Sequence, residues 1–194
     1  MTNSSLWLAV LIAAVSFGIE RLHRGNAPET FHASAQMKGP LGMIGVTMDI
    51  HIDRYLSNPD RAGMLAALRS GGAESFSRAL KSAPAAGYLE VGDRRWTIRW
   101  AHEEERDLGR VIVLATDEPV YFFETGGHAK SRAGYTAAVI RLDVDVIGTG
   151  AGTMYAAAMV RPTEDGSGVK VDDYADQPLQ LVMVTKDYSS SLRI

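Results

Sequence analysis

Apolar and polar residues alternate along most of this chain with a period of two, which is typical of β-strands. Every second residue is apolar from Phe31 to Lys38, and the alternation resumes from Ile44 to Ile52 after the turn sequence Gly39–Gly42. Because successive side chains of a strand point to opposite faces, each run has one apolar and one polar face. The two runs predict a β-hairpin with one face in a core and the other in water.

A helical pattern interrupts the strands over about 59–82. Asn58 is the expected N-cap, Pro59 takes the first helical position, and Gly71–Gly72 ends a first helix. A second short helix is expected over 73–82. Neither is long enough to be stable alone in water, so we expect both to pack on the sheet. The side chains expected to face the sheet are those of Met64, Leu65, Leu68, Phe76, Ala79 and Leu80.

The rest of the chain returns to strand-like runs separated by short polar turns. Parallel strands need long crossover connections, so the short turns favour antiparallel pairing. We expect an α+β fold that is predominantly antiparallel β, either a sandwich or a partly open barrel, with the helical insertion packed on the sheet. The expected further strands are 87–91, 95–102, 110–115, 120–124, 135–147, 153–161, 169–174 and 179–185.

Composition narrows the class of protein. The chain has 194 residues, of which 46% are hydrophobic, and this suits one globular domain. It has no cysteine, which excludes disulfides, thiolate metal sites and a cysteine nucleophile. The net charge of -3 is spread along the chain, so we expect no nucleic-acid partner. We divide the chain into an N-terminal segment (1–28), a single β-rich domain (29–188) and a C-terminal tail (189–194).

The uncharged run Leu6–Ile19 dominates the N-terminal segment. As a helix it would span about 21 Å, less than the roughly 30 Å of a bilayer core. That length fits a signal peptide, with Ala14–Ser16 as cleavage region, and predicts a periplasmic or secreted protein. No Lys or Arg precedes the run, whereas Arg21 and Arg24 follow it. An uncleaved membrane anchor and a buried cytosolic helix are the alternatives, and membrane contact is expected through Leu6–Ile19 if the run is uncleaved.

Two alternating polar runs are the main candidates for chemistry. In each, the side chains share one strand face, where carboxylates and imidazole can hold a metal or act as acid and base. Same-face neighbours lie about 7 Å apart, too far for one metal without a third element, and a solvated strand face is the simpler interpretation. If the two faces converged on a cavity, they would form an acid–base site. The candidates are Asp49, His51 and Asp53 in one run, and Arg141, Asp143 and Asp145 in the other.

Three further motifs depart from the patterns that they resemble. The glycine-rich stretch 148–153 lacks the spacing of a nucleotide-binding loop and is predicted to be a bulged or flexible hairpin turn. The stretch 102–106 begins like a zinc-protease motif but has Arg106 where a second histidine is needed, which favours a charged hairpin tip. Glu124 and His128 flank a glycine turn without an evident nucleophile. We therefore expect no metal and no cofactor.

The aromatic residues complete the functional hypothesis. Trp96, Ile98 and Trp100 are predicted to share a strand face, where the tryptophans fill the sheet–helix interface or line an apolar cavity. Arg141 is a further candidate for contact with a ligand. The leading hypothesis is a non-enzymatic, exported cell-envelope domain that binds a small apolar ligand or an envelope protein. The alternative is a hydrolase or isomerase that uses the Asp/His groups.

Overall fold

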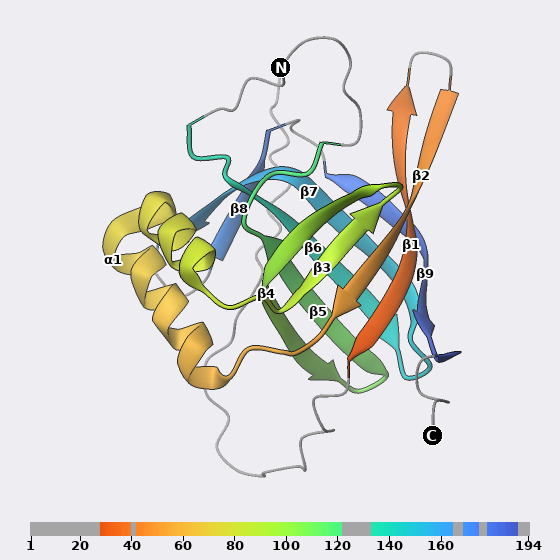
Figure 1. Ribbon diagram of the computed structural model, residues 1–194, viewed down its shortest axis with the longest axis horizontal. Helices are drawn as coiled ribbons and strands as arrows, with labels where there is room; N and C mark the ends of the chain where they lie inside the picture. The colour runs from red at the N-terminus through yellow and green to blue at the C-terminus, as the bar shows by residue number, and fades with distance from the viewer. Residues whose placement is uncertain (1–27, 40–41, 122–132, 165–168, 175–177, 190–194) are drawn as a thin grey trace.

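The computed structural model contains nine strands and one helix within the residues that it describes (Figure 1). These are residues 28–39, 42–121, 133–164, 169–174 and 178–189. The elements are β1 (Glu29–Gly39), β2 (Gly42–Ile52), α1 (Asn58–Ser82), β3 (Gly87–Val91), β4 (Arg94–Arg106), β5 (Gly109–Thr116), β6 (Ala137–Asp145), β7 (Thr149–Pro162), β8 (Val169–Asp173) and β9 (Leu179–Asp187).

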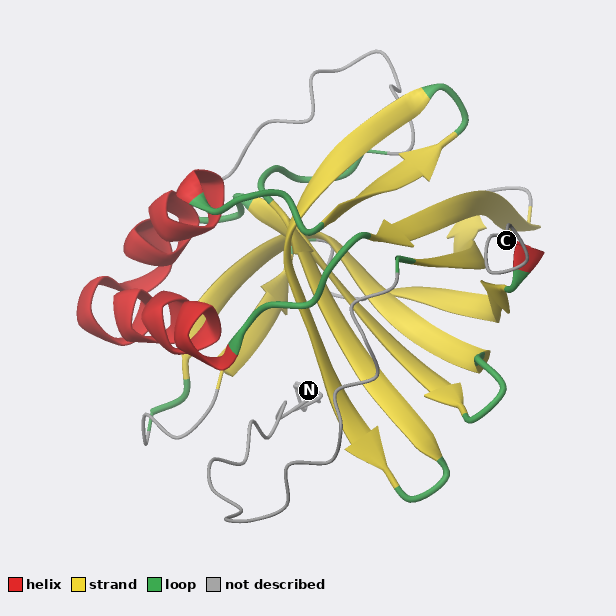
Figure 2. Cartoon of the chain, turned by 60° about the horizontal axis from the view of Figure 1, so that its bottom comes forward, coloured by secondary structure: helices red, strands yellow, loops and turns green. Residues whose placement is uncertain are grey.

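Eight of the strands form a closed antiparallel barrel. The sheet order is β6-β5-β4-β3-β2-β1-β9-β7-β8, and an additional pairing of β6 with β7 closes the ring. The long strand β7 makes this possible, since one of its edges pairs with β6, and the other edge pairs with β9 in its first part and with β8 in its last part. The predicted antiparallel fold with a helical insertion is confirmed, and of the two predicted architectures the chain adopts the barrel. Figure 2 shows the strands curving around one axis, with the helix outside the wall.

The barrel interior is a packed apolar core. The predicted hairpin is confirmed, and Phe31 and Ile50 of its inward face have 0% exposure, as do Leu89, Ile112 and Leu114 on other strands. A side chain without accessible surface borders no space that a water molecule can enter. An eight-stranded barrel is of a size that its own side chains can fill. These inward side chains therefore leave no room for a ligand between them.

The helix covers one side of the barrel. It begins after Ser57, whose hydroxyl accepts a hydrogen bond from the N–H of Asp60, so the N-cap is Ser57 and the prediction of Asn58 was wrong by one residue. The two predicted helices are one element with a kink at Gly72 (φ 64°, ψ -158°). The helix packs on the outer faces of β4 and β7. The predicted side chains Met64, Leu65, Leu68, Phe76 and Leu80 are buried there, and Ala79 is partly buried.

A bulge in β4 separates the two tryptophans. The pairing with β5 shifts by one residue between Ile98 and Trp100. Trp96 and Ile98 consequently face the barrel interior, whereas Trp100 points outward and packs against Phe76 of α1, with ring centroids 6.2 Å apart. The predicted common face of the three residues was wrong, because a bulge reverses the alternation beyond it. Of the two tryptophans, Trp100 lies at the sheet–helix interface and Trp96 does not.

Two segments that were predicted to be turns belong at least partly to strands. The stretch from His102 to Arg106 belongs to β4, and the hairpin tip is shorter than expected. In the glycine-rich stretch the turn ends at Gly148, and Gly150 and Gly152 belong to β7, with a bulge between them against β9. A Cβ at Gly150 would lie 1.9 Å from the carbonyl oxygen of Asp143, so glycine allows β6 and β7 to approach each other.

Some predictions fall partly outside the described residues. Val120 and Tyr121 are not in a strand, and the remainder of the predicted strand 120–124 lies outside, as do Glu124, His128 and Leu6–Ile19. Among the described residues, no helix is long and apolar enough to span a membrane.

Replacing Gly63 by alanine is expected to stabilise the protein. Gly63 lies in α1, and nothing is within 4 Å of the position that its Cβ would take. Alanine reduces the conformational freedom of the unfolded chain, so the gain in the free energy of unfolding should be about 0.5–1 kcal/mol. Urea denaturation of the two proteins measures it, and a loss of stability would show that this face of the helix is covered.

Candidate functional site

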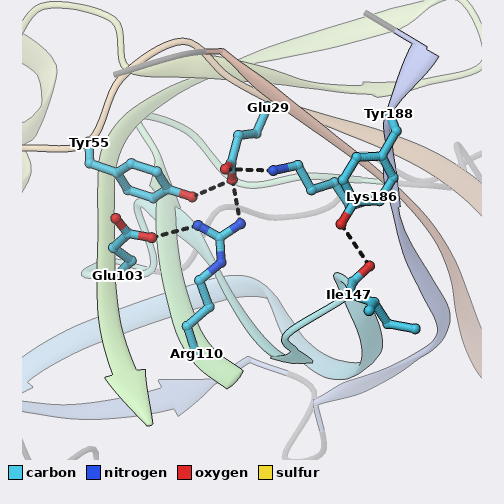
Figure 3. Close-up of polar contacts among 7 residues, drawn as sticks. All are labelled: Glu29, Tyr55, Glu103, Arg110, Ile147, Lys186 and Tyr188. Atoms are coloured by element: carbon cyan, nitrogen blue, oxygen red, sulfur yellow. Dashed lines mark hydrogen bonds and ion pairs between the residues drawn. The ribbon is translucent and has the colours of Figure 1, made fainter. Parts of the chain in front are cut away.

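A layer of charged side chains closes one end of the barrel. We call it the basal layer; Figure 3 shows how its side chains converge from four strands and from the segment that follows β2. Each charged member lies two positions from a core residue of its strand, so its side chain also points inward. The members are Glu29 of β1, Tyr55, Glu103 of β4, Arg110 of β5 and Lys186 of β9.

Glu29 is the centre of the basal layer. Its carboxylate accepts hydrogen bonds from the Tyr55 hydroxyl (3.0 Å), from Arg110 (2.6 Å) and from Lys186 (2.9 Å). Arg110 also donates to Glu103 at 2.6 Å, so two acidic and two basic groups balance each other. The side chains of Glu29 and Arg110 are only 15% and 17% exposed. The layer thus pairs its charges over the apolar core instead of leaving them unsatisfied.

The protonation states favour this fixed pairing. Burial raises the pKa of Glu29, but hydrogen bonds and charges from Lys186 and Arg110 outweigh it and hold the pKa below its ordinary value. Burial, together with the negative charge of Glu29, raises the pKa of the Tyr55 phenol. Glu29 therefore stays ionised and Tyr55 stays neutral at physiological pH. Neither group has a pKa near neutral pH, which a general acid or base needs.

The stability of the protein should depend on Glu29 at acidic pH. Because the folded pKa of Glu29 lies below the unfolded value of about 4.3, the unfolded state takes up the proton first as the pH falls. The stabilisation is complete above that value and is lost as the pH falls through the folded pKa. We expect the stability difference between the protein and its Glu29→Gln variant to shrink in this window. Urea denaturation at a series of pH values measures it, and a difference that does not change with pH would contradict the pairing.

A second polar arrangement lies on the outer face of the barrel, on the side away from α1. We call it the outer ladder, since two rows of paired residues cross β9, β1, β2, β3 and β4. Strand register alone brings them together, because residues two apart on one strand share a face. One row is Thr185, His32, Asp49, Glu90 and Arg95, and the other is Asp187, Thr30, His51, Tyr88 and Thr97.

The side chains of the outer ladder contact one another across the strands. The Nδ1 of His32 donates to Asp49 at 2.6 Å, and the Nδ1 of His51 lies 2.9 Å from the Thr30 hydroxyl. His51 stacks on Tyr88 with ring centroids 4.3 Å apart. The guanidinium of Arg95 lies 4.0 Å from the centre of the Tyr88 ring. Both histidines are thereby held in defined orientations on an open face.

The edge of the outer ladder at β9 is irregular. The pairing of β1 with β9 shifts between His32 and Ser34, and Met183 beside this shift has a φ of 51°, which is uncommon for a residue other than glycine. Asp187 lies 3.9 Å from the Nε2 of His32. Hydrogen bonds from Ser189, and to a smaller extent the charges of His32 and His51, lower the pKa of Asp187. A carboxylate thus faces each side of the His32 ring.

The structure separates the predicted site residues. Asp49 and His51 lie in the outer ladder, and Asp53 is exposed just beyond the end of β2. Asp143 and Asp145 lie on β6, which is not a neighbour of β2, so the five groups do not form one site. The remaining candidates are likewise apart. Arg141 pairs with Asp143 of its own strand at 2.9 Å, Trp96 lies in the interior, and Trp100 lies under α1.

The alternation along the chain does not predict the basal layer or the contacts of His32. It places Glu29 at the linker boundary, Glu103 in a hairpin tip, and His32 among the polar residues of a strand face. One signal in the sequence does point to the layer. In each of four strands, a charged residue lies two positions from the last inward-facing core residue and therefore shares its face. The core residues are Phe31, Ala101, Ile112 and Val184.

Comparison with known proteins gives no guide to the function of this chain. Comparisons with protein-family models, curated proteins and solved structures gave no match. Within the described part of the chain, no group of three or more His, Asp or Glu residues is arranged to hold a metal ion. The fold and the two polar arrangements therefore define the class of protein: a closed antiparallel barrel with a packed interior, a charged basal layer and an ordered polar outer face.

Proposed function

We propose that this chain is a non-enzymatic domain of the cell envelope that binds a protein partner through its outer ladder. The observation that supports this most strongly is the contrast between the two faces of β1 and β2. The inward face is a core without accessible space around Phe31 and Ile50. The outward face carries His32 and Asp49, which are 50% and 46% exposed and already oriented by their mutual hydrogen bond.

A protein partner suits this surface better than a small apolar ligand does. The outer ladder offers rows of donors and acceptors together with the stacked rings of His51 and Tyr88. Oriented polar side chains around an aromatic residue are typical of protein interfaces. A small apolar ligand would need a pocket between apolar side chains, and the interior side chains pack against one another instead.

The enzymatic alternative has one favourable observation. The His32–Asp49 pair has the geometry in which a carboxylate orients an imidazole. Both groups are open to water, however, whereas acid–base catalysis gains from a site that excludes it. The carboxylates of β6 that a hydrolase or isomerase was expected to use lie on another part of the barrel. We therefore favour binding.

The location in the cell envelope is supported by the N-terminal sequence. The uncharged run Leu6–Ile19 has the length of a signal-peptide core. The chain has no cysteine, so an oxidising compartment outside the cytoplasm would not introduce unwanted disulfides. N-terminal sequencing of the protein isolated from its source tests this proposal. A chain that begins near Phe17 indicates export with cleavage, and a chain that begins at Met1 contradicts cleavage and leaves a membrane anchor or a buried helix.

Partner binding can be tested by photo-crosslinking in the source organism. A photoreactive amino acid at Thr185, beside His32 in the outer ladder, should crosslink to a protein partner, whereas one at Ala66 on the exposed side of α1 should not. The Asp49→Asn variant should lower the crosslinking yield at Thr185 by about tenfold, because it removes a charge-assisted hydrogen bond from the surface.

Asp143→Asn is the matched control for Asp49→Asn. Asp143 is an equally exposed aspartate on the outer face of β6 and is paired with Arg141. It should leave the yield at Thr185 unchanged. Equal yields at Thr185 and Ala66, or equal losses in the two asparagine variants, would contradict recognition through the outer ladder.

A further inference from the structure

Four large apolar side chains are exposed at the end of the barrel that carries the basal layer. Leu108 is 84% exposed, Val146 74%, Ile147 63% and Tyr188 50%. We call them the basal tips. They occupy the turn between β4 and β5, the turn between β6 and β7, and the residue after β9. Single exposed apolar residues are ordinary, but four at one end of the molecule require an explanation.

The basal tips are neighbours. Gly109 pairs with Asp145, so the preceding Leu108 lies beside the following Val146. The hydroxyl of Tyr188 donates to the carbonyl oxygen of Ile147 at 2.8 Å, which joins the end of β9 to the same turn. The four side chains therefore form a continuous row across three pieces of chain.

The turn between β6 and β7 is held in place. Asp145 accepts hydrogen bonds from the N–H groups of Ile147 and Thr149, both at 2.9 Å, and also from the hydroxyl of Thr149. Gly148, with a φ of 75°, makes the reversal that these contacts require. Val146 and Ile147 thus project from a defined turn.

The first strand of the barrel begins beside the basal tips. Glu29 is the first residue of β1, and it pairs with Arg110, which lies two residues after Leu108, and with Lys186, which lies two residues before Tyr188 (Figure 3). The apolar run Leu6–Ile19 is joined to this point by residues 20–28. A segment of that length reaches at most about 30 Å. Any membrane that holds the apolar run therefore lies within about 30 Å of Glu29, at the end of the barrel that carries the basal tips.

We propose that the basal tips dock on the surface of a phospholipid bilayer, beside the contact made by Leu6–Ile19. Leucine, valine and isoleucine at turn tips can enter the boundary between headgroups and acyl chains, and Tyr188 suits the headgroup level. The outer ladder lies on the side wall of the barrel and stays open to a partner. The inference applies to the chain that keeps Leu6–Ile19 uncleaved. It goes beyond the proposed partner binding, since the two surfaces share no residue.

A lipid-borne quencher gives a direct test. The chain has no cysteine, so Val146→Cys in the full-length protein carries a single fluorophore. The protein is reconstituted into vesicles of phosphatidylcholine and phosphatidylglycerol that contain lipids brominated near the headgroup. The fluorophore at position 146 should be quenched. The same fluorophore in Asp93→Cys, in the turn between β3 and β4 at the opposite end, should not be.

Polar variants separate docking by the tips from tethering by the N-terminal run. The double change Leu108→Asn and Ile147→Asn should lower the quenched population at position 146 by about tenfold, because it removes two inserting side chains. The control double change Ile44→Asn and Met183→Asn, at exposed apolar residues elsewhere, should leave it unchanged. Quenching that is absent at position 146, as when the N-terminal run or a second copy covers the tips, would overturn the proposal. Quenching that is equal at positions 146 and 93 would do the same.

Discussion

Replacing Phe31 by alanine is expected to lower the free energy of unfolding by about 3–5 kcal/mol, the range for removing a large aromatic side chain from a packed core. Phe31 has 0% exposure on the inward face of β1, directly above the basal layer, and the Arg110 guanidinium lies 5.7 Å from the centre of its ring. Packed surroundings relax only partly into the cavity, so both the lost burial and the cavity contribute. Urea denaturation of the full chain measures the loss.

Leu108→Ala is the control for this change. Leu108 is exposed, so its replacement should alter stability by less than about 0.5 kcal/mol. If Phe31→Ala lowers the free energy of unfolding by less than about 1 kcal/mol, the interior is loosely packed, as it would be around a ligand cavity. That result would favour binding of a small apolar ligand over binding of a protein partner.

Replacing Arg110 by alanine should cost about 2–4 kcal/mol, because it leaves the carboxylates of Glu29 and Glu103 facing each other at the end of the barrel. Lys186 would still pair with Glu29, so the loss should be smaller than the roughly 3–5 kcal/mol expected when a fully buried pair is broken. The double variant Glu29→Gln and Arg110→Met should recover part of the loss, because the layer then keeps one negative charge on Glu103 and one positive charge on Lys186 instead of two negative charges and one positive charge.

Arg106→Ala is the matched control, since Arg106 lies on the same hairpin and pairs with Glu104 on the exposed surface. Its cost should be below about 1 kcal/mol, as for other exposed ion pairs. If Arg110→Ala and Arg106→Ala cost the same, or if the double variant is less stable than Arg110→Ala, the basal layer does not close the barrel as a balanced unit.

The parts of the fold that could be predicted from the sequence are those set by local alternation. The hairpin of β1 and β2 follows from the period of two, and the kinked helix follows from its apolar spacing and from the glycine at position 72. Ring closure could not be predicted, because alternation says which face a side chain takes but not which strand lies beside it. The three partners of β7 and the bulge in β4 depend on contacts between distant parts of the chain.

The same limit applies to the candidate sites. Asp49 and His51 were singled out because they share a face, but their partners His32, Thr30 and Tyr88 come from other strands. Glu29 and Lys186 are separated by 157 positions, and no local pattern joins them. Asp143 and Asp145 have the same local pattern as Asp49 and His51, yet lie elsewhere on the barrel. Patterns along one strand therefore identify half of such a site at most.

Native mass spectrometry of the protein isolated from its source under non-denaturing conditions tests most directly whether the barrel is packed inside and recognises its partner outside. The expected result is the mass of the polypeptide, alone or with a protein partner that Asp49→Asn releases and Asp143→Asn retains. A stoichiometric apolar small molecule, whose retention changes when Phe31 or Ile112 is replaced, would contradict the packed interior and place binding inside the barrel.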